Sequence, residues 1–90
     1  MKIEFTDHAK KRMRERNLLL RQIEEFVRNP DSREISTKNS RRFLIKKTYY
    51  HPALKKNHLL MAICEEDADK VVVITIIDTS KIRKYTKDIW

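Results

Sequence analysis

A histidine and two arginines recur at every fourth residue near the start of the chain: His8, Arg12 and Arg16. If this segment is helical, the spacing places the three side chains in one stripe on the helix surface. An imidazole is the usual protein base near neutral pH, and a guanidinium holds a phosphate through two parallel hydrogen bonds. The stripe therefore has the groups needed to bind a phosphate and to move a proton beside it. The alternative is structural: His8 bonds to the backbone, and the arginines pair with Asp7, Glu15 or acids of a sheet.

We expect the stripe to lie on a short helix that begins after Thr6 and ends at Asn17. The hydroxyl of Thr6 suits the cap of a first turn, and Asn17 can take the left-handed conformation that ends a helix. Phe5, Ala9 and Met13 are also spaced by four and share a second face. Because these three residues are apolar or small, their face should be the buried one.

A second set of basic and aromatic residues lies in an expected strand over residues 41–50. Its candidates are Arg41, Arg42 and Tyr50 for nucleic-acid binding, and Lys46 and Lys47 for catalysis. Cations beside aromatic rings suit RNA, because rings stack on bases and cations contact phosphates. Metal-free RNA cleavage needs a base for the 2′-hydroxyl proton, cations for the phosphorane charge, and an acid for the leaving oxygen. The alternative is a solvated strand face.

The composition also points to a polyanionic partner. The 90 residues include 21 lysines and arginines against 13 acids, a net charge of +8. Such an excess on a small domain favours RNA or DNA ahead of a membrane. The alternative is a lysine-rich solvated surface. The sequence has no glycine, which excludes a glycine-rich phosphate loop or a dinucleotide-binding fingerprint.

Metal and membrane functions have little support in the sequence. Cys64 is the only cysteine, and the three histidines lack the spacing of metal ligands. No apolar stretch approaches the roughly 18 residues of a transmembrane helix, and no apolar segment of a signal peptide follows the charged start. We therefore expect a cytoplasmic protein with no metal and no cofactor.

The hydrophobic periodicity predicts an α+β fold in a single domain, residues 1–90. A short strand at residues 2–5 should precede two helices, and their short link predicts a side-by-side helical hairpin over residues 6–29. A mostly antiparallel sheet of four strands should follow over residues 32–78. Expected strands cover residues 32–37, 41–50, 58–65 and 70–78, and the second helix covers residues 18–28.

The most apolar strand and the C-terminal segment are expected to meet. Residues 71–77 are apolar on both faces, so they should form a central strand covered on both sides. The helices would cover one side, and the C-terminal tail or another subunit the other. The tail, residues 79–90, carries Lys81, Arg83 and Lys84, which we interpret as a nucleic-acid-binding or partner-binding patch.

The chain resembles a widespread prokaryotic family of small domains of unknown function, numbered four-two-five-eight. The family pattern His-Ala-x-x-Arg-x-x-x-Arg is matched from His8 to Arg16, and residues 72–75 and 80–85 are also similar to the family. Such domains are similar in layout to RelE/ParE-type toxins and to barnase-like and colicin-like ribonucleases. The resemblance implies metal-independent RNA cleavage in a toxin–antitoxin system, with an acidic antitoxin as partner. Fold does not fix function, however, and ParE-type members are not ribonucleases.

We therefore expect a small basic RNA-binding protein that acts as a toxin-type, metal-independent endoribonuclease. His8 would act as base or acid; Arg12 and Arg16, with Arg42, would bind phosphate; and Lys46 or Lys47 would stabilise the transition state. Two alternatives stay open: a non-catalytic nucleic-acid-binding module, and a protein-interaction module that pairs with an antitoxin or forms a homodimer through the sheet or tail.

Overall fold

The computed structural model describes residues 1–82 of the chain. Its elements are β1 (Lys2–Phe5), α1 (Asp7–Glu15), α2 (Leu20–Arg28), β2 (Ser32–Ile35), β3 (Arg42–His51), β4 (Lys56–Asp67) and β5 (Lys70–Thr79). This order of a short strand, two helices and four further strands confirms the expected α+β class. The predicted roles of Arg83 and Lys84 lie outside the described residues.

The five strands form one mixed sheet in the order β1-β5-β4-β3-β2. β1 pairs with β5 in parallel, and all the other pairs are antiparallel. β5 therefore lies inside the sheet, as its apolar run predicts. The register between β4 and β5 shifts at one point, where Thr75 lies opposite Ile63 but Val73 lies opposite Cys64. Ile74 is thus the extra residue of a β-bulge, which bends a strand locally.

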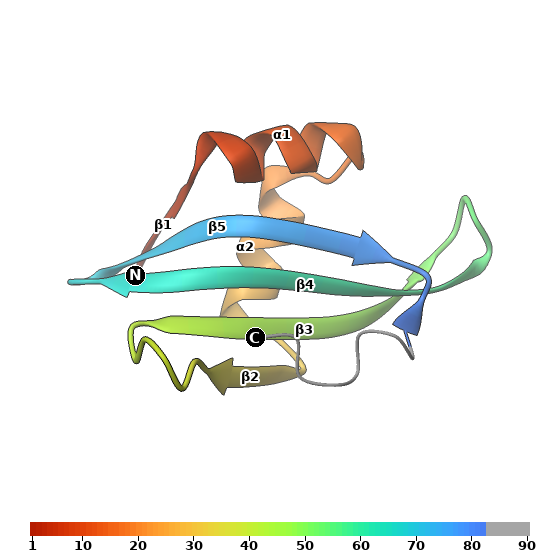
Figure 1. Ribbon diagram of the computed structural model, residues 1–90. Helices are drawn as coiled ribbons and strands as arrows, with labels where there is room; N and C mark the ends of the chain where they lie inside the picture. Colours follow the sequence, from red (N-terminus) through yellow and green to blue (C-terminus); the bar gives the residue numbers. More distant parts are fainter. Residues whose placement is uncertain (83–90) are drawn as a thin grey trace.

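The two helices do not lie side by side, contrary to the expected helical hairpin. Figure 1 shows α2 crossing the strands on one face of the sheet, whereas α1 lies along β5 beyond that strand. The physical reason is the short β1. Because β1 pairs only with the first residues of β5, from Lys70 to Val73, the rest of that edge is left for α1. Ile23 and Phe26 of α2 are instead buried over the sheet.

The core lies between the helices and one side of the sheet, which we call the helix side. Alternate residues of β3, β4 and β5 face it, as period-two patterning requires. Its buried members are Ala9, Met13, Ile23, Phe26, Val27, Phe43, Ile45, Leu60, Ala62, Cys64, Val71, Val73 and Ile76. The burial of Ala9 and Met13 confirms the predicted buried face of α1.

The other side of the sheet, which we call the opposite side, has a smaller apolar cluster. Leu44, Leu59 and Met61 are buried there, and Ile77 and Ile82 pack against them. Ile82 belongs to the segment that follows β5, so the beginning of the C-terminal segment covers part of this side. That placement agrees with the expected cover by the tail as far as Ile82. No helix within residues 1–82 is long and apolar enough to cross a membrane.

Candidate active site

Thr6 attaches the beginning of α1 to β5. Its backbone N–H donates to the carbonyl oxygen of Val73 at 3.1 Å, and its hydroxyl donates to the carbonyl oxygen of Ile74 at 2.7 Å. The same hydroxyl oxygen accepts the backbone N–H of Ala9 at 3.1 Å. Thr6 is therefore the predicted helix cap, and it also joins the first turn of α1 to the bulge in β5.

This attachment brings His8 to Thr75. The two side chains meet with His8 Nε2 and Thr75 Oγ1 separated by 3.0 Å, and the imidazole is otherwise exposed. Thr75 lies opposite Ile63, which packs on the Leu44–Met61 cluster, so Thr75 belongs to the opposite side of the sheet. The hydroxyl can orient the imidazole while leaving the ring open to a ligand.

Arg12 and Arg16 continue the stripe along β5. Together with Ile76, Ile77 and Asp78 they line a shallow hollow at the edge of the sheet. Arg12 lies 4.0 Å from Glu15, and both side chains are about half exposed, with 46% and 48% of their surface accessible. An exposed pair this loose contributes about 0–1 kcal/mol. Arg16 forms no ion pair within residues 1–82, so both guanidinium groups are accessible to an anion.

The structure does not bring Lys46 or Lys47 to His8. The side chain of Lys46 shares the opposite side with Thr75, because it lies across from Met61. However, β3 is two strands away from β5, which is about 10 Å at ordinary strand spacing. Lys46 is only 9% exposed, and its ammonium group lies 3.7 Å from Glu34. Lys47 lies on the helix side and donates to the carbonyl oxygen of Asn29 at 3.2 Å.

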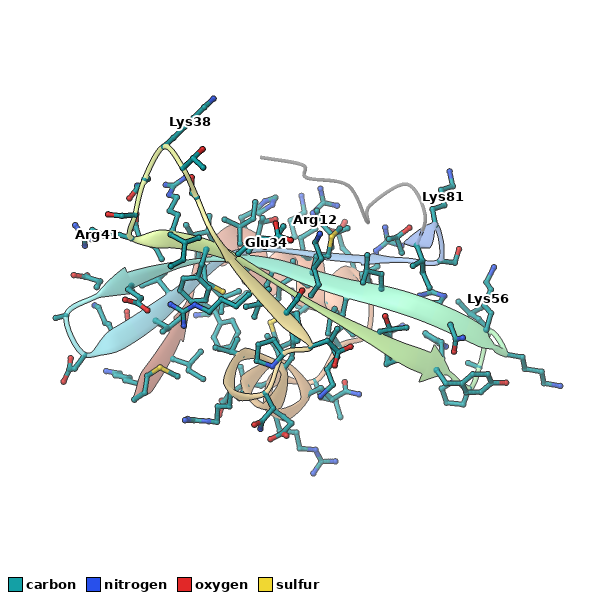
Figure 2. All side chains as sticks on the ribbon, turned by 90° about the horizontal axis from the view of Figure 1, so that it is seen from below. Arg12, Glu34, Lys38, Arg41, Lys56 and Lys81 are labelled. Carbon is teal, nitrogen blue, oxygen red and sulfur yellow. The ribbon has the colours of Figure 1, made fainter. Side chains whose placement is uncertain are left out.

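The other predicted nucleic-acid contacts divide between the two ends of the sheet. Arg41 and Arg42 pair with Asp67 and Glu65 across the sheet, each at 3.4 Å. Tyr50 is 59% exposed near the end of β3. Figure 2 shows Lys38 and Arg41 at one end of the molecule, and Lys56 and Lys81 at the other.

A buried polar cluster at the root of the β3–β4 hairpin has no counterpart in the predicted site. Asp78 Oδ1 accepts the hydroxyl of Tyr49 at 2.9 Å and Nδ1 of His58 at 3.0 Å. The ring of His51 lies 4.9 Å from that of His58, measured between centroids. Burial, and then the hydrogen bond and charge of Asp78, raise the pKa of Tyr49. Within residues 1–82, His58 Nε2 is buried without a hydrogen-bond partner.

Neither Thr75 nor the cluster around Asp78 was predicted from the sequence as part of a site, and the reasons differ. Thr75 is the single polar residue in the run 71–77, and a polar residue inside a buried run is a usable signal. Tyr49, His58 and Asp78 come from three strands, and only the register of those strands brings them together. No spacing within one segment could have indicated that contact.

The fold and the site together define a class: a small basic α+β protein with a histidine–arginine stripe beside a mixed five-stranded sheet. Within residues 1–82 no group of three or more histidine, cysteine or acidic side chains is arranged to hold a metal ion. The family described as Domain of unknown function (DUF4258) matches residues 5–78, and the chain belongs to this family. That range includes both the stripe and Thr75. No curated protein and no solved structure matches the chain.

Proposed function

We propose that this protein binds RNA and cleaves it without a metal ion, as a toxin-type endoribonuclease of a toxin–antitoxin system. One observation carries the proposal: the exposed imidazole of His8 lies 3.0 Å from the hydroxyl of Thr75, and Arg12 follows one helical turn later. This arrangement combines an oriented proton acceptor with a cation in reach of the same phosphate.

The proposed reaction is an internal transfer at the phosphodiester. His8 takes the proton of the 2′-hydroxyl, and the 2′ oxygen then attacks phosphorus. Arg12 and Arg16 stabilise the added negative charge of the phosphorane, because fixed cations beside a developing charge lower the barrier. The bond from phosphorus to the 5′ oxygen breaks, and that oxygen takes a proton from water. The products are a 2′,3′-cyclic phosphate and a 5′-hydroxyl end.

The proposed site is smaller than the one expected from the sequence. Lys46, Lys47 and Arg42 each have a partner within the described residues: Glu34, the carbonyl oxygen of Asn29, and Glu65. We therefore leave them out of the catalytic set. A ribonuclease of this kind would act in the cytoplasm, and its basic surface would suit an acidic antitoxin protein.

The test is incubation of labelled, unstructured RNA with the purified protein in EDTA, beside His8→Ala and Lys10→Ala. We expect wild type and Lys10→Ala to leave cyclic-phosphate ends, because Lys10 lies on another face of α1. His8→Ala should lose about 10²- to 10⁴-fold in rate, the usual contribution of a general base. Equal cleavage by His8→Ala would refute the proposed role of His8.

A non-catalytic nucleic-acid-binding module is the second candidate. It is favoured by the outer surface of α1, where the exposed cations Lys10, Lys11 and Arg14 form no ion pair within residues 1–82. In that case wild type and His8→Ala would bind RNA with the same salt dependence, Lys10→Ala would show a smaller one, and none of the three would cleave RNA.

A further inference from the structure

The β3–β4 hairpin extends beyond the rest of the sheet. The last residue of β5, Thr79, lies opposite Leu59. The pairing of β3 with β4 continues past this point, through Tyr50 opposite Asn57 to His51 opposite Lys56. Figure 1 shows this hairpin projecting past the end of β5. We call residues 50–57 the projecting hairpin.

The projecting hairpin is basic and has an exposed aromatic ring. From Lys46 to Cys64 the chain contains no acidic residue. Lys55 and Lys56 are exposed, and neither forms an ion pair in the described part of the chain. Tyr50 is 59% exposed, so its ring can stack on a ligand. Lys81, which follows β5, lies at the same end of the molecule as Lys56 in Figure 2.

The tip of the hairpin places a lysine in a conformation that favours glycine or asparagine. Lys55 has a φ of 53°, in the left-handed region, where a side chain crowds the backbone. The chain therefore carries a cation at the most projecting turn, although glycine or asparagine would fit there with less strain.

The root of the projecting hairpin is firmly attached to β5. Tyr49 and His58 lie opposite each other on β3 and β4, and both side chains bond to Asp78 near the end of β5. The ring of His51 packs against that of His58. These contacts hold the hairpin in position before any ligand binds, which lowers the entropic cost of binding.

We propose that the projecting hairpin is a docking element for single-stranded RNA, separate from the His8 stripe. Tyr50 stacks on an unpaired base, and Lys55 and Lys56 contact phosphates. The ligand is single-stranded because bases in a duplex already stack on one another and leave no free face for the ring. This inference rests on the proposed function for the identity of the ligand, but it does not depend on catalysis.

The experiment measures binding of a fluorescent 20-nucleotide oligouridine by anisotropy, at several salt concentrations, with the full chain. We expect Tyr50→Ala to weaken binding about 5- to 150-fold, the range for one base–aromatic stack. The double variant Lys55→Asn/Lys56→Gln should reduce the slope of log K against log salt by about 1.4, or about 0.7 per phosphate contact on a single strand. Asparagine is chosen because it tolerates positive φ.

The charge-matched control is Arg21→Gln/Lys38→Gln, which removes two exposed cations away from the hairpin; Lys38 lies at the other end of the molecule (Figure 2). The control should bind more tightly than the hairpin double variant, and adding Tyr50→Ala to the control should weaken binding by the same factor as in wild type. Circular dichroism of every variant checks that the variant keeps the wild-type fold.

The outcomes separate this inference from the proposed function. If the hairpin variants bind oligouridine as the control does, the hairpin is not an RNA site, whether or not the wild type cleaves RNA. If they lose binding and no protein cleaves RNA, the docking element is supported and the catalytic proposal fails. If the wild type itself does not bind oligouridine, or binds duplex RNA equally well and without regard to Tyr50, the inference is overturned.

Discussion

The hydroxyl of Thr6 donates a hydrogen bond to the carbonyl oxygen of Ile74, 68 residues later in the chain, at 2.7 Å. Ile74 is the bulged residue of β5, and the next residue is Thr75, which contacts His8. One side chain thus caps α1 and joins it to the strand beside the candidate base. The bulge and the cap together set where His8 lies.

Replacing Thr6 by valine should destabilise the protein by about 1–2 kcal/mol, because it removes the cap and leaves the Ile74 carbonyl without this donor. Thr6→Ser keeps the hydroxyl and should cost less than half as much. Urea denaturation followed by circular dichroism measures both. If valine and serine were equally tolerated, the hydroxyl would not stabilise this junction.

Thr75→Val should lower the rate of RNA cleavage by about 5- to 30-fold, since it removes the hydroxyl that orients His8 while keeping the shape of the side chain. Thr75→Ser should restore most of the rate. Single-turnover kinetics with saturating protein separate this effect from weaker binding. An unchanged rate in Thr75→Val would show that the contact has no part in catalysis.

Lys46→Met should leave RNA cleavage within about twofold of wild type, because Lys46 is buried beside Glu34 and lies two strands from β5. A loss of rate as large as that in His8→Ala would return Lys46 to the catalytic set. The same cleavage assay in EDTA decides between these results.

Stability should fall as the pH rises above about 9. Burial raises the pKa of the Cys64 thiol from 9.0 to about 12, and burial with the Asp78 contact raises that of Tyr49 above its ordinary 10.0. When folding raises the pKa of an acidic group, its neutral form stabilises the folded state at pH values below the unfolded-state pKa. This contribution is lost as the pH rises from the unfolded-state pKa toward the folded-state pKa. Cys64 alone gives a slope of up to about 1.4 kcal/mol per pH unit above pH 9.

Urea denaturation at several pH values from 7 to 11 measures this slope in wild type, Cys64→Ala and Tyr49→Phe. Each variant should show a shallower decline than wild type, because one ionising group is gone. A wild-type stability that stays level through pH 11 would contradict the raised pKa values.

Ala68→Gly should stabilise the protein by about 0.5–1 kcal/mol. Ala68 lies in the turn between β4 and β5 with a φ of 57°. At this φ the β-carbon of alanine costs about 1–2 kcal/mol, which glycine avoids. The greater conformational freedom of glycine in the unfolded chain offsets part of that stabilisation. Ala53→Gly is the matched control, because Ala53 lies in the β3–β4 turn without positive φ. It should be neutral or destabilising. Thermal unfolding of the two variants compares them directly.

The local pattern of apolar and polar residues was enough to predict most of the secondary structure and the stripe of His8, Arg12 and Arg16. Alternation along an expected strand over residues 41–50 places Phe43 and Ile45 on one side and Leu44 on the other, as the structure has them. The positive φ of Asn17 was likewise predicted from its place after a helix. These features depend on neighbours within a few residues, whose side-chain directions are set by the helix and strand repeats.

Contacts between distant segments were decided only by the tertiary structure. The meeting of His8 with Thr75, and of Tyr49 and His58 with Asp78, depends on strand register and on the bulge at Ile74. The sequence alone determined which residues share a face of one element. The tertiary structure decided which of these faces meet, because the apolar sides of both helices and four strands are buried in one core. Packing that core depends on all of these elements at once.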